Sequence, residues 1–430
     1  MRHPWRWFES LDRWRAALVI FAIALATRGG LLAVTQTYLK VERYELERAA
    51  ISLAQHGTLA NPYLIPTGPT AHVPPGYPLI LAAIFGIFGT GHAGEFVKQF
   101  CSAAVVSAQY ALLPVVCPAF GIPRRVGLLA ALFGALLPMK YSTEVLGDWE
   151  APYAALALLL LLYAAALTWR ERSFGARRGF FQGLGWGIAF LITPGLMPVF
   201  GAVLALGFMV RARGLRAPYA RYAAAGIGGA ALCLLPWAIR NEAALGAPVI
   251  TRSNFGLEIR LSNNDLAGPL EPENYTNGVY HAFHPLQNLR EAQAVRSMGE
   301  VAYNSDRLKK GIQWIRCHPE RFAWLTAWRA LYTWFPNTRV RWRDLISDAL
   351  TLGCLMGLVL LWRRERDFAL LLAGALLTYT PLYYLIHVNG RHRYPVDWII
   401  LLVAFYGFTA AYQRIVKPLR EPAAAHTAQG

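Results

Sequence analysis

The sequence predicts an all-α, polytopic membrane protein with about ten transmembrane helices. Three observations support this prediction. Of the 430 residues, 55% are hydrophobic, and the mean hydropathy is +0.32. Apolar runs of about 15 to 22 residues recur along the chain, close to the length that crosses a bilayer. Basic residues give a net charge of +17 but cluster in short segments beside these runs. They therefore predict an orientation in the membrane and argue against nucleic-acid binding.

Each long apolar run is predicted to form one span, although several are short for a bilayer of about 30 Å. The predicted spans cover residues 16–36, 98–118, 125–139, 150–168, 180–193, 195–210, 222–239, 347–362, 368–387 and 398–413. Two further apolar segments, 77–88 and 322–335, are predicted to lie at the membrane interface or to dip into it. The second contains three Trp residues and Arg329, a composition suited to the headgroup region.

The distribution of basic residues favours this topology. The predicted inner loops contain 20 Lys or Arg residues, in segments 2–15, 124–125, 170–178, 211–221, 363–366 and 414–420. If both interfacial segments crossed the membrane, three of these basic loops would move outside, against the positive-inside rule. We therefore expect both termini to be cytoplasmic.

The topology divides the chain into four parts. Residues 1–239 form an N-terminal transmembrane module that includes the outer loop 37–97. Residues 240–346 are polar and too long for a simple connection, so they are expected to form a soluble outer loop domain. Residues 347–413 form the C-terminal transmembrane helices, and residues 414–430 form a cytoplasmic tail.

Two groups of acidic residues are predicted to meet on the outer face. An amphipathic helix within 41–50 carries Glu42, Glu45 and Glu47, and the turn 141–150 carries Glu144, Asp148 and Glu150. Carboxylates at an apolar boundary have a raised pKa, which suits general-base chemistry and makes the 1–239 module the predicted catalytic part. The alternative is a solvated helix face, with Glu150 pairing with a helix macrodipole.

The predicted outer turn 387–397 carries Arg391 and Arg393, against the charge rule that the other loops follow. Arginine forks bind phosphate in bidentate fashion, so these residues are candidate phosphate ligands. The alternatives are contact with ordinary lipid phosphates, or neutralisation of Asp397. Arg240, Asn254 and Glu258 provide groups that hydrogen-bond sugar hydroxyls, although any surface domain would contain such residues.

The sequence lacks the motifs of several other function classes. It contains no GxGxxG after a strand, no GxxxxGK[ST] and no HExxH. The His residues show no metal-ligand spacing, and the five Cys residues form no CxxC pair. No metal or other cofactor is therefore predicted from spacing.

Eight segments between the first span and about Asp397 carry a family resemblance: 44–54, 67–78, 149–150, 236–241, 253–258, 284–286, 299–300 and 391–395. Together they resemble the GT-C type integral-membrane glycosyltransferases, nearest to the glycosyltransferase family 39 and aminoarabinose-transferase-like group of bacteria. Each segment is short, but their order is specific.

The resemblance implies a GT-C fold in the bacterial inner membrane with a periplasmic active site. The implied donor is a sugar on a polyprenyl phosphate, and the implied acceptor is a glycan, lipid or protein at the surface of the membrane lipid. Glu45 would deprotonate the acceptor with inversion at the anomeric carbon, with Glu42 as the alternative base. Glu150 matches the second acid, and His72 and Tyr77 lie in the matching 67–78 segment. A divalent metal is not universal in the family, and this sequence shows no ligand set for one.

Two other function classes remain open. A lipid or sugar transporter would place charged or broken helices at mid-membrane, where Arg28 and the Pro194–Gly195 turn are candidates. A scaffold protein would tolerate loss of Glu45 or Arg391. An enzyme instead requires one outer cavity that Glu45, Glu150 and Arg391 all reach.

Overall fold

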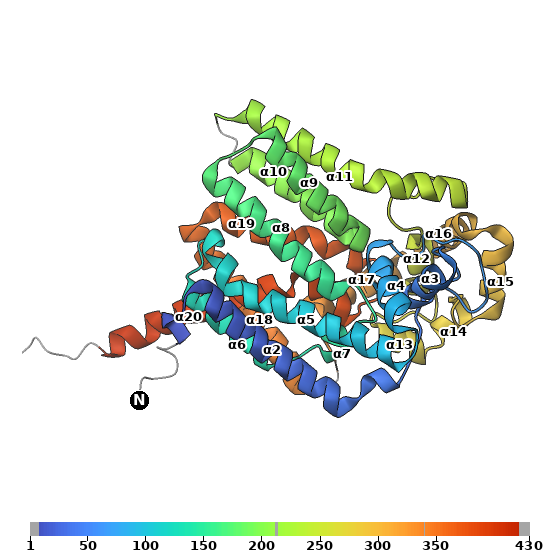
Figure 1. The fold of residues 1–430 in the computed structure, drawn as a ribbon, viewed down its shortest axis with the longest axis horizontal. Coiled ribbons are helices and arrows are strands. Elements are labelled where there is room, and N and C mark those ends of the chain that lie inside the picture. Colours follow the sequence, from blue (N-terminus) through green and yellow to red (C-terminus); the bar gives the residue numbers. More distant parts are fainter. Residues whose placement is uncertain (1–7, 211–213, 339, 421–430) are drawn as a thin grey trace, which may run out of the picture.

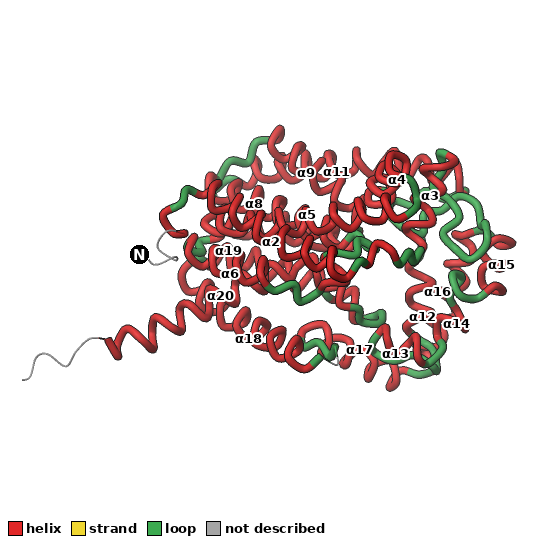
Figure 2. The backbone as a smooth tube through the Cα atoms, turned by 60° about the horizontal axis from the view of Figure 1, so that its bottom comes forward, coloured by secondary structure: helices red, strands yellow, loops and turns green. Residues whose placement is uncertain are grey.

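The computed structural model describes residues 8–210, 214–338 and 340–420, and within them the regular structure is entirely helical (Figures 1 and 2). Ten of the helices coincide with the ten predicted spans. They are α2 (Arg13–Thr35), α5 (His92–Val116), α6 (Arg124–Leu136), α8 (Ala151–Glu171), α9 (Ala176–Ile192), α10 (Met197–Val210), α11 (Arg216–Leu245), α18 (Arg341–Arg364), α19 (Arg366–Tyr379) and α20 (Gly390–Arg420).

Six of the described helices are long and apolar enough to cross a membrane: α2, α5, α8, α11, α18 and α20. The chain is thus a multi-pass membrane protein. Helices α6, α9, α10 and α19 contain only 13 to 17 residues. They are shorter than the about 20 residues that a perpendicular span needs, so the count of ten spans stays a prediction.

Small residues allow the apolar helices to approach closely. Gly179, Gly183 and Gly187 recur every fourth residue on α9, on the side that faces α11. A Cβ atom on Gly183 would overlap the backbone of Gly226 on α11. In a membrane, helices associate through such close packing, because lipid already satisfies their apolar surface.

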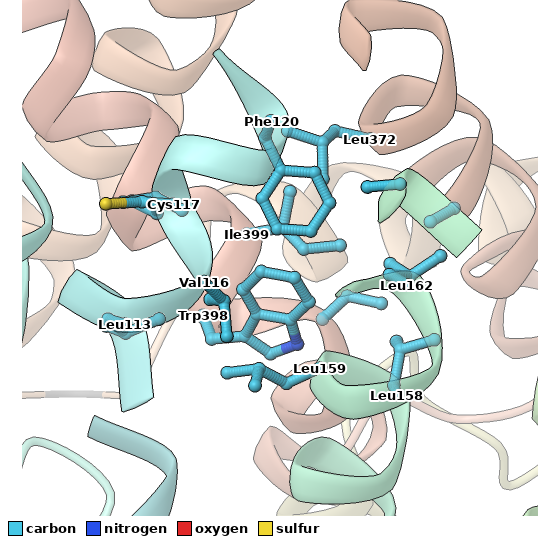
Figure 3. Packing of buried hydrophobic residues seen from close by; sticks show 14 of the residues in the cluster. Leu113, Val116, Cys117, Phe120, Leu158, Leu159, Leu162, Leu372, Trp398 and Ile399 are labelled. Atoms are coloured by element: carbon cyan, nitrogen blue, oxygen red, sulfur yellow. The ribbon is translucent and has the colours of Figure 1, made fainter. Parts of the chain in front are cut away.

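Trp398 on α20 lies at the centre of the bundle. Figure 3 shows its indole ring among Leu113 and Val116 of α5, Phe120 at the end of η2 (Cys117–Phe120), and Leu159 of α8. The side chain is buried, and its ring lies 6.1 Å from that of Phe120. This packing fixes the position of α20, whose first turn carries Arg391.

The helices of the two long outer loops gather at one end of the bundle (Figure 1, right). The first loop contributes η1 (Thr37–Leu39), α3 (Glu45–His56) and α4 (Gly76–Phe88). The second contributes α12 (Phe255–Ser262), α13 (Glu271–Thr276), α14 (Val279–Phe283), α15 (Leu289–Met298), α16 (Glu300–Cys317) and α17 (Pro319–Trp334). Helix α2 begins, and α20 ends, at the opposite end.

The segment 240–346 shares its apolar core with the first loop. Tyr63 packs with Leu257, Leu261, Val279 and Tyr303 in one buried cluster. Helix α11 continues to Leu245, and α18 already begins at Arg341, so the non-spanning segment is shorter than predicted. The two loops form one shared layer over the end of the bundle.

Short elements complete this layer. They are α7 (Tyr141–Glu144), η3 (Pro194–Leu196) and η4 (Pro381–Tyr384). A further short element, η2, lies at the other end of the bundle, where the Ala119 carbonyl accepts a hydrogen bond from Arg170. The predicted outer turn 387–397 is mostly helical, because α20 begins at Gly390 rather than near residue 398. Arg391 and Arg393 therefore lie on a helix and not in a flexible turn.

Candidate active site

A cavity of about 300 Å³ lies between the loop layer and the bundle. Six of the predicted site residues line it: Glu45, His72, Glu150, Asn254, Glu258 and Arg391. These residues come from α3, the 67–78 segment, the start of α8, the start of α12 and the first turn of α20. Glu45, Glu150 and Arg391 thus all line one cavity, as expected for an enzyme.

Glu45 is the first residue of α3, and its carboxylate is buried. The His284 Nε2 atom lies 3.0 Å from Glu45 Oε1. The backbone N–H of Leu286 donates to the other ring nitrogen, Nδ1, over 3.1 Å. Nδ1 therefore carries no proton, and Nε2 donates its proton to Glu45. Burial acts to raise the pKa of Glu45, but the interaction with His284 outweighs it and lowers the pKa to about 2. The raised pKa that the sequence predicted for the acids of this helix is therefore wrong for Glu45.

His72 lies on the other side of this acid. Its Nδ1 atom is 2.8 Å from the Tyr63 hydroxyl. Burial lowers the pKa of His72 to about 3, so this ring is neutral. Glu45 is consequently an ionised carboxylate that His284 contacts directly, with the neutral ring of His72 nearby.

Arg391 lies on the opposite wall. Its guanidinium carbon is 3.3 Å from the centre of the Trp149 ring, and Nη2 is 3.8 Å from Glu271 Oε1. Stacking on Trp149 fixes the plane of the guanidinium group and leaves its edge available for a ligand.

A second arginine, Arg252, also lines the cavity, although it was not among the predicted phosphate ligands. Its Nε atom is buried and, among the described residues, has no hydrogen-bond partner. An unpaired buried donor beside a cavity indicates a place for an acceptor group of a ligand. Its position directly before the Ser253–Glu258 match is the signal that could have identified it.

Glu150 immediately precedes α8, and its carboxylate faces the cavity. A negative charge at this position is stabilised by the helix macrodipole. Glu150 can therefore interact with the macrodipole of α8, which was its predicted alternative role, and still line the cavity.

Aromatic rings form much of the remaining wall, and the sequence assigned none of them to the site. They are Tyr44, Trp149, Tyr275, Tyr280, Tyr379 and Tyr383. Tyr275 and Tyr280 stack with their centroids 4.0 Å apart, and Tyr44 lies 5.6 Å from Trp149. Flat rings with polar edges suit a ligand that has both apolar faces and hydroxyl groups.

Two predicted site residues of the first loop lie outside the cavity. Glu42 precedes α3 rather than lying on it; its side chain is exposed and accepts a hydrogen bond from Tyr44 over 3.0 Å. Tyr77 is buried behind the wall, where its hydroxyl donates to the Gly147 carbonyl. Neither side chain lines the cavity in which its role was predicted, and Tyr77 instead contacts the turn that carries Trp149.

Arg240 and Arg393 also lie outside. The Arg240 guanidinium donates to the carbonyls of Leu59 and Thr70, each over 2.8 Å, and so holds the 67–78 segment. Arg393 donates to Asp397 over 2.7 Å and to the Thr333 carbonyl over 2.9 Å. Arg393 therefore does not line the cavity as a phosphate ligand would, and the alternative of neutralising Asp397 applies to it.

Asp148 points away from the cavity toward Lys98, 3.0 Å away. Arg28, the charge inside the first span, is buried and donates to Glu144 over 2.6 Å and to the Gly134 carbonyl over 2.9 Å. The two terminal nitrogens of Arg28 are thus held by contacts within the bundle, and this arrangement gives no support to a transport pathway.

Among the described residues, one group of potential metal ligands comes together: Glu47, Glu95 and Asp148. One carboxylate oxygen of each lies within 4.8 Å of the other two. The Lys98 ammonium already lies among these oxygens. The cluster therefore does not fit a metal ion in the present chain.

No protein-family model matches the sequence, and no curated protein matches it. Solved structures of the Archaeoglobus fulgidus oligosaccharyltransferase AglB match its fold. The complex with an inhibitory peptide and a dolichol-phosphate has a TM-score of 0.57 at 13% identity, covering 99% of this chain and 53% of that chain. The form tethered to an acceptor peptide with the NVT sequon has a TM-score of 0.56 at 13% identity, covering 96% and 52%.

The complex of the same archaeal protein with Zn and sulfate has a TM-score of 0.55 at 14% identity, covering 94% of this chain and 50% of that chain. The present chain thus spans about half the length of AglB. AglB is a GT-C type glycosyltransferase. The likeness covers nearly all of this chain, and it shows that the chain has the GT-C glycosyltransferase fold.

Proposed function

We propose that the protein is an inverting membrane glycosyltransferase that moves a sugar from a polyprenyl-phosphate donor to an acceptor at the outer face of the membrane. One observation carries this proposal: a single cavity brings an ionised acid, Glu45, together with the guanidinium groups of Arg391 and Arg252. The GT-C fold supports it, as does the dolichol-phosphate bound to AglB.

The proposed step is a direct displacement. The acceptor hydroxyl attacks the anomeric carbon, the bond from that carbon to the phosphate oxygen breaks, and the phosphate leaves with the bonding electrons. Glu45 takes the hydroxyl proton, and the His284 Nε2–H bond orients the carboxylate. Arg391 and Arg252 stabilise the charge that develops on the phosphate, and their positions are set before the reaction begins.

The two sides of the cavity differ in polarity. Ala154 of α8, Pro194 and Gly195 of η3 and Leu382 of η4 form an apolar wall toward the bundle. The loop layer supplies Asn254, Glu258 and the tyrosines. A polyprenyl chain would leave along the apolar wall into lipid, and the sugar would lie against the loop layer. Glycans, lipids and proteins all remain candidate acceptors.

The same arrangement supports an extracytoplasmic site. The loop layer lies at one end of the bundle, and the start of α2 and the end of α20 lie at the other (Figure 1). With the 20 basic residues of the predicted inner loops inside, the cavity would face the periplasm of a bacterial inner membrane.

A transfer assay tests the proposal. The purified protein in lipid nanodiscs is incubated with radiolabelled polyprenyl-phosphate sugars and a glycan, lipid or peptide acceptor. We expect the label to move to one acceptor class, with an inverted anomeric configuration measured by NMR. Retained configuration would contradict the single displacement. Donor that crosses proteoliposome membranes without any product would instead favour a transporter.

The pH dependence should report the Glu45–His284 interaction. Because the pKa of Glu45 is about 2, the carboxylate stays ionised as the pH falls from 7 to 5, and kcat/KM should not drop through its protonation. In His284→Ala, burial remains and the opposing interaction is lost, so the acid limb should move up by about one to three pH units. A control is His281→Ala, an exposed residue of α14, the helix that ends directly before His284. Coincident profiles of His284→Ala and wild type would contradict this role.

A further inference from the structure

Three carboxylates from three separate elements meet directly behind the cavity wall. Glu47 belongs to α3, Glu95 to α5, and Asp148 to the turn before α8. One oxygen of each lies within 4.8 Å of the other two. Converging carboxylate oxygens of this kind are the ligands that a hard divalent cation prefers. Within the described part of the chain, however, the position among them belongs to a side chain.

That side chain is Lys98 of α5. Its ammonium nitrogen is 2.5 Å from Glu95 Oε1 and 3.0 Å from Asp148 Oδ1, and it pairs with Glu47 Oε1. The Lys98 side chain is 1% exposed and that of Glu47 is fully buried. Arg43 pairs with the outer side of the cluster, 2.9 Å from Glu95 Oε2. Two cations thus face three carboxyl groups, and burial raises the pKa of Glu47 to about 7 despite the contact with Lys98.

The cluster connects the two segments that carry the reacting groups. Glu47 follows Glu45 by two residues on α3, and so points away from the cavity while Glu45 points into it. Asp148 directly precedes Trp149, which stacks on Arg391. The distance between the acid and the arginine is therefore set through the contacts that Lys98 makes with Glu47 and Asp148.

We infer that the Lys98 ammonium takes the place of a divalent cation at this cluster and acts as a positioning residue, holding α3 against the Trp149 turn. Buried carboxylates repel one another unless a cation lies between them, so loss of Lys98 should separate the two segments. Since a displacement of about 1 Å can cost about 10²-fold in rate, Lys98→Ala should lower kcat by roughly that factor while changing the donor KM little. This kinetic expectation depends on the proposed function.

Metal binding tests the inference without using activity. In Lys98→Ala the three carboxylates face one another without their ammonium, so Mn²⁺ should bind and raise the Tm of the variant. In wild-type protein, Mn²⁺ should not raise the Tm. Electron paramagnetic resonance of wild-type protein should also show no bound Mn²⁺ signal that depends on Asp148, as judged by comparison with Asp148→Asn. The matched control is Lys309→Ala, which removes an exposed lysine of α16. If transfer is measurable, Mn²⁺ should also restore at least part of the lost kcat.

Two results would overturn the inference. Wild-type protein that binds Mn²⁺ in an Asp148-dependent manner would show that a metal, not Lys98, occupies the cluster. A folded Lys98→Ala variant with no Mn²⁺-dependent change in Tm would show that the carboxylates do not form a cation site. If Lys98→Ala does not fold, the comparison of wild type with Asp148→Asn still decides the matter. Absence of transfer in wild type would contradict the proposed function and leave the metal-binding comparison intact.

Discussion

Glu45→Gln is expected to lower kcat of sugar transfer by about 10²- to 10⁴-fold, the usual contribution of a general base. The amide keeps the shape of the side chain and still accepts the His284 Nε2–H bond, but it cannot take the acceptor proton. Donor binding should be retained, because Arg391 and Arg252 remain. Transfer kinetics and the Kd of a polyprenyl-phosphate donor measure the two effects separately.

The matched control is Glu42→Gln. Glu42 lies three residues earlier, is exposed and does not line the cavity, so its substitution should leave kcat close to that of wild type. Equal kcat values for Glu45→Gln and wild type would remove Glu45 as the base. A large loss in Glu42→Gln alone would return the role to the residue that the sequence offered as its alternative.

Arg391→Lys should lower kcat/KM by about 10²-fold, although it preserves the positive charge. Lysine can neither stack as a plane on Trp149 nor present two parallel donors to a phosphate. The loss should appear with every competent sugar donor, because it concerns the phosphate and not the sugar. Steady-state kinetics with two donors of different sugar would measure it.

Arg393→Lys is the corresponding control on the same helix turn. Arg393 contacts Asp397 and the end of α17 outside the cavity, so the variant should keep kcat/KM and lower the Tm. Equal losses of kcat/KM in the two variants would indicate a general effect on α20, and would contradict the assignment of phosphate binding to Arg391.

The apolar helices were predictable because span length and hydrophobicity are local properties of the sequence. All ten predicted spans coincide with helices, although only six described helices reach full membrane length. The acid at residue 45 was also predictable, since it lies in a short segment between a span and the 67–78 segment. Helix limits were less predictable: α20 begins about eight residues before the expected span.

This boundary explains one error at the site. In a flexible turn, Arg391 and Arg393 could point to the same phosphate. On a helix, residues two positions apart do not face each other, so Arg391 lines the cavity while Arg393 faces α17. The direction in which each side chain points depends on the residue at which the helix begins, and hydropathy alone does not locate that residue.

The partners of Glu45 and Glu47 depend on contacts between distant segments. His284 lies 239 positions from Glu45, and Lys98 lies 51 positions from Glu47. No local spacing relates these residues, and a lysine at the start of an apolar span reads in the sequence as an interfacial charge. The aromatic wall was missed for the same reason, because its six rings come from separate elements.

Cysteine labelling in intact cells tests most directly whether the acid and the arginine share the outer face. In a variant without the five native cysteines, Glu42→Cys and Gly390→Cys provide exposed reporters beside Glu45 and Arg391, and Arg364→Cys provides one at the end of α18. We expect a membrane-impermeant maleimide to label positions 42 and 390 from outside, and position 364 only after the membrane is permeabilised. Labelling of 42 and 390 from opposite sides would contradict the account.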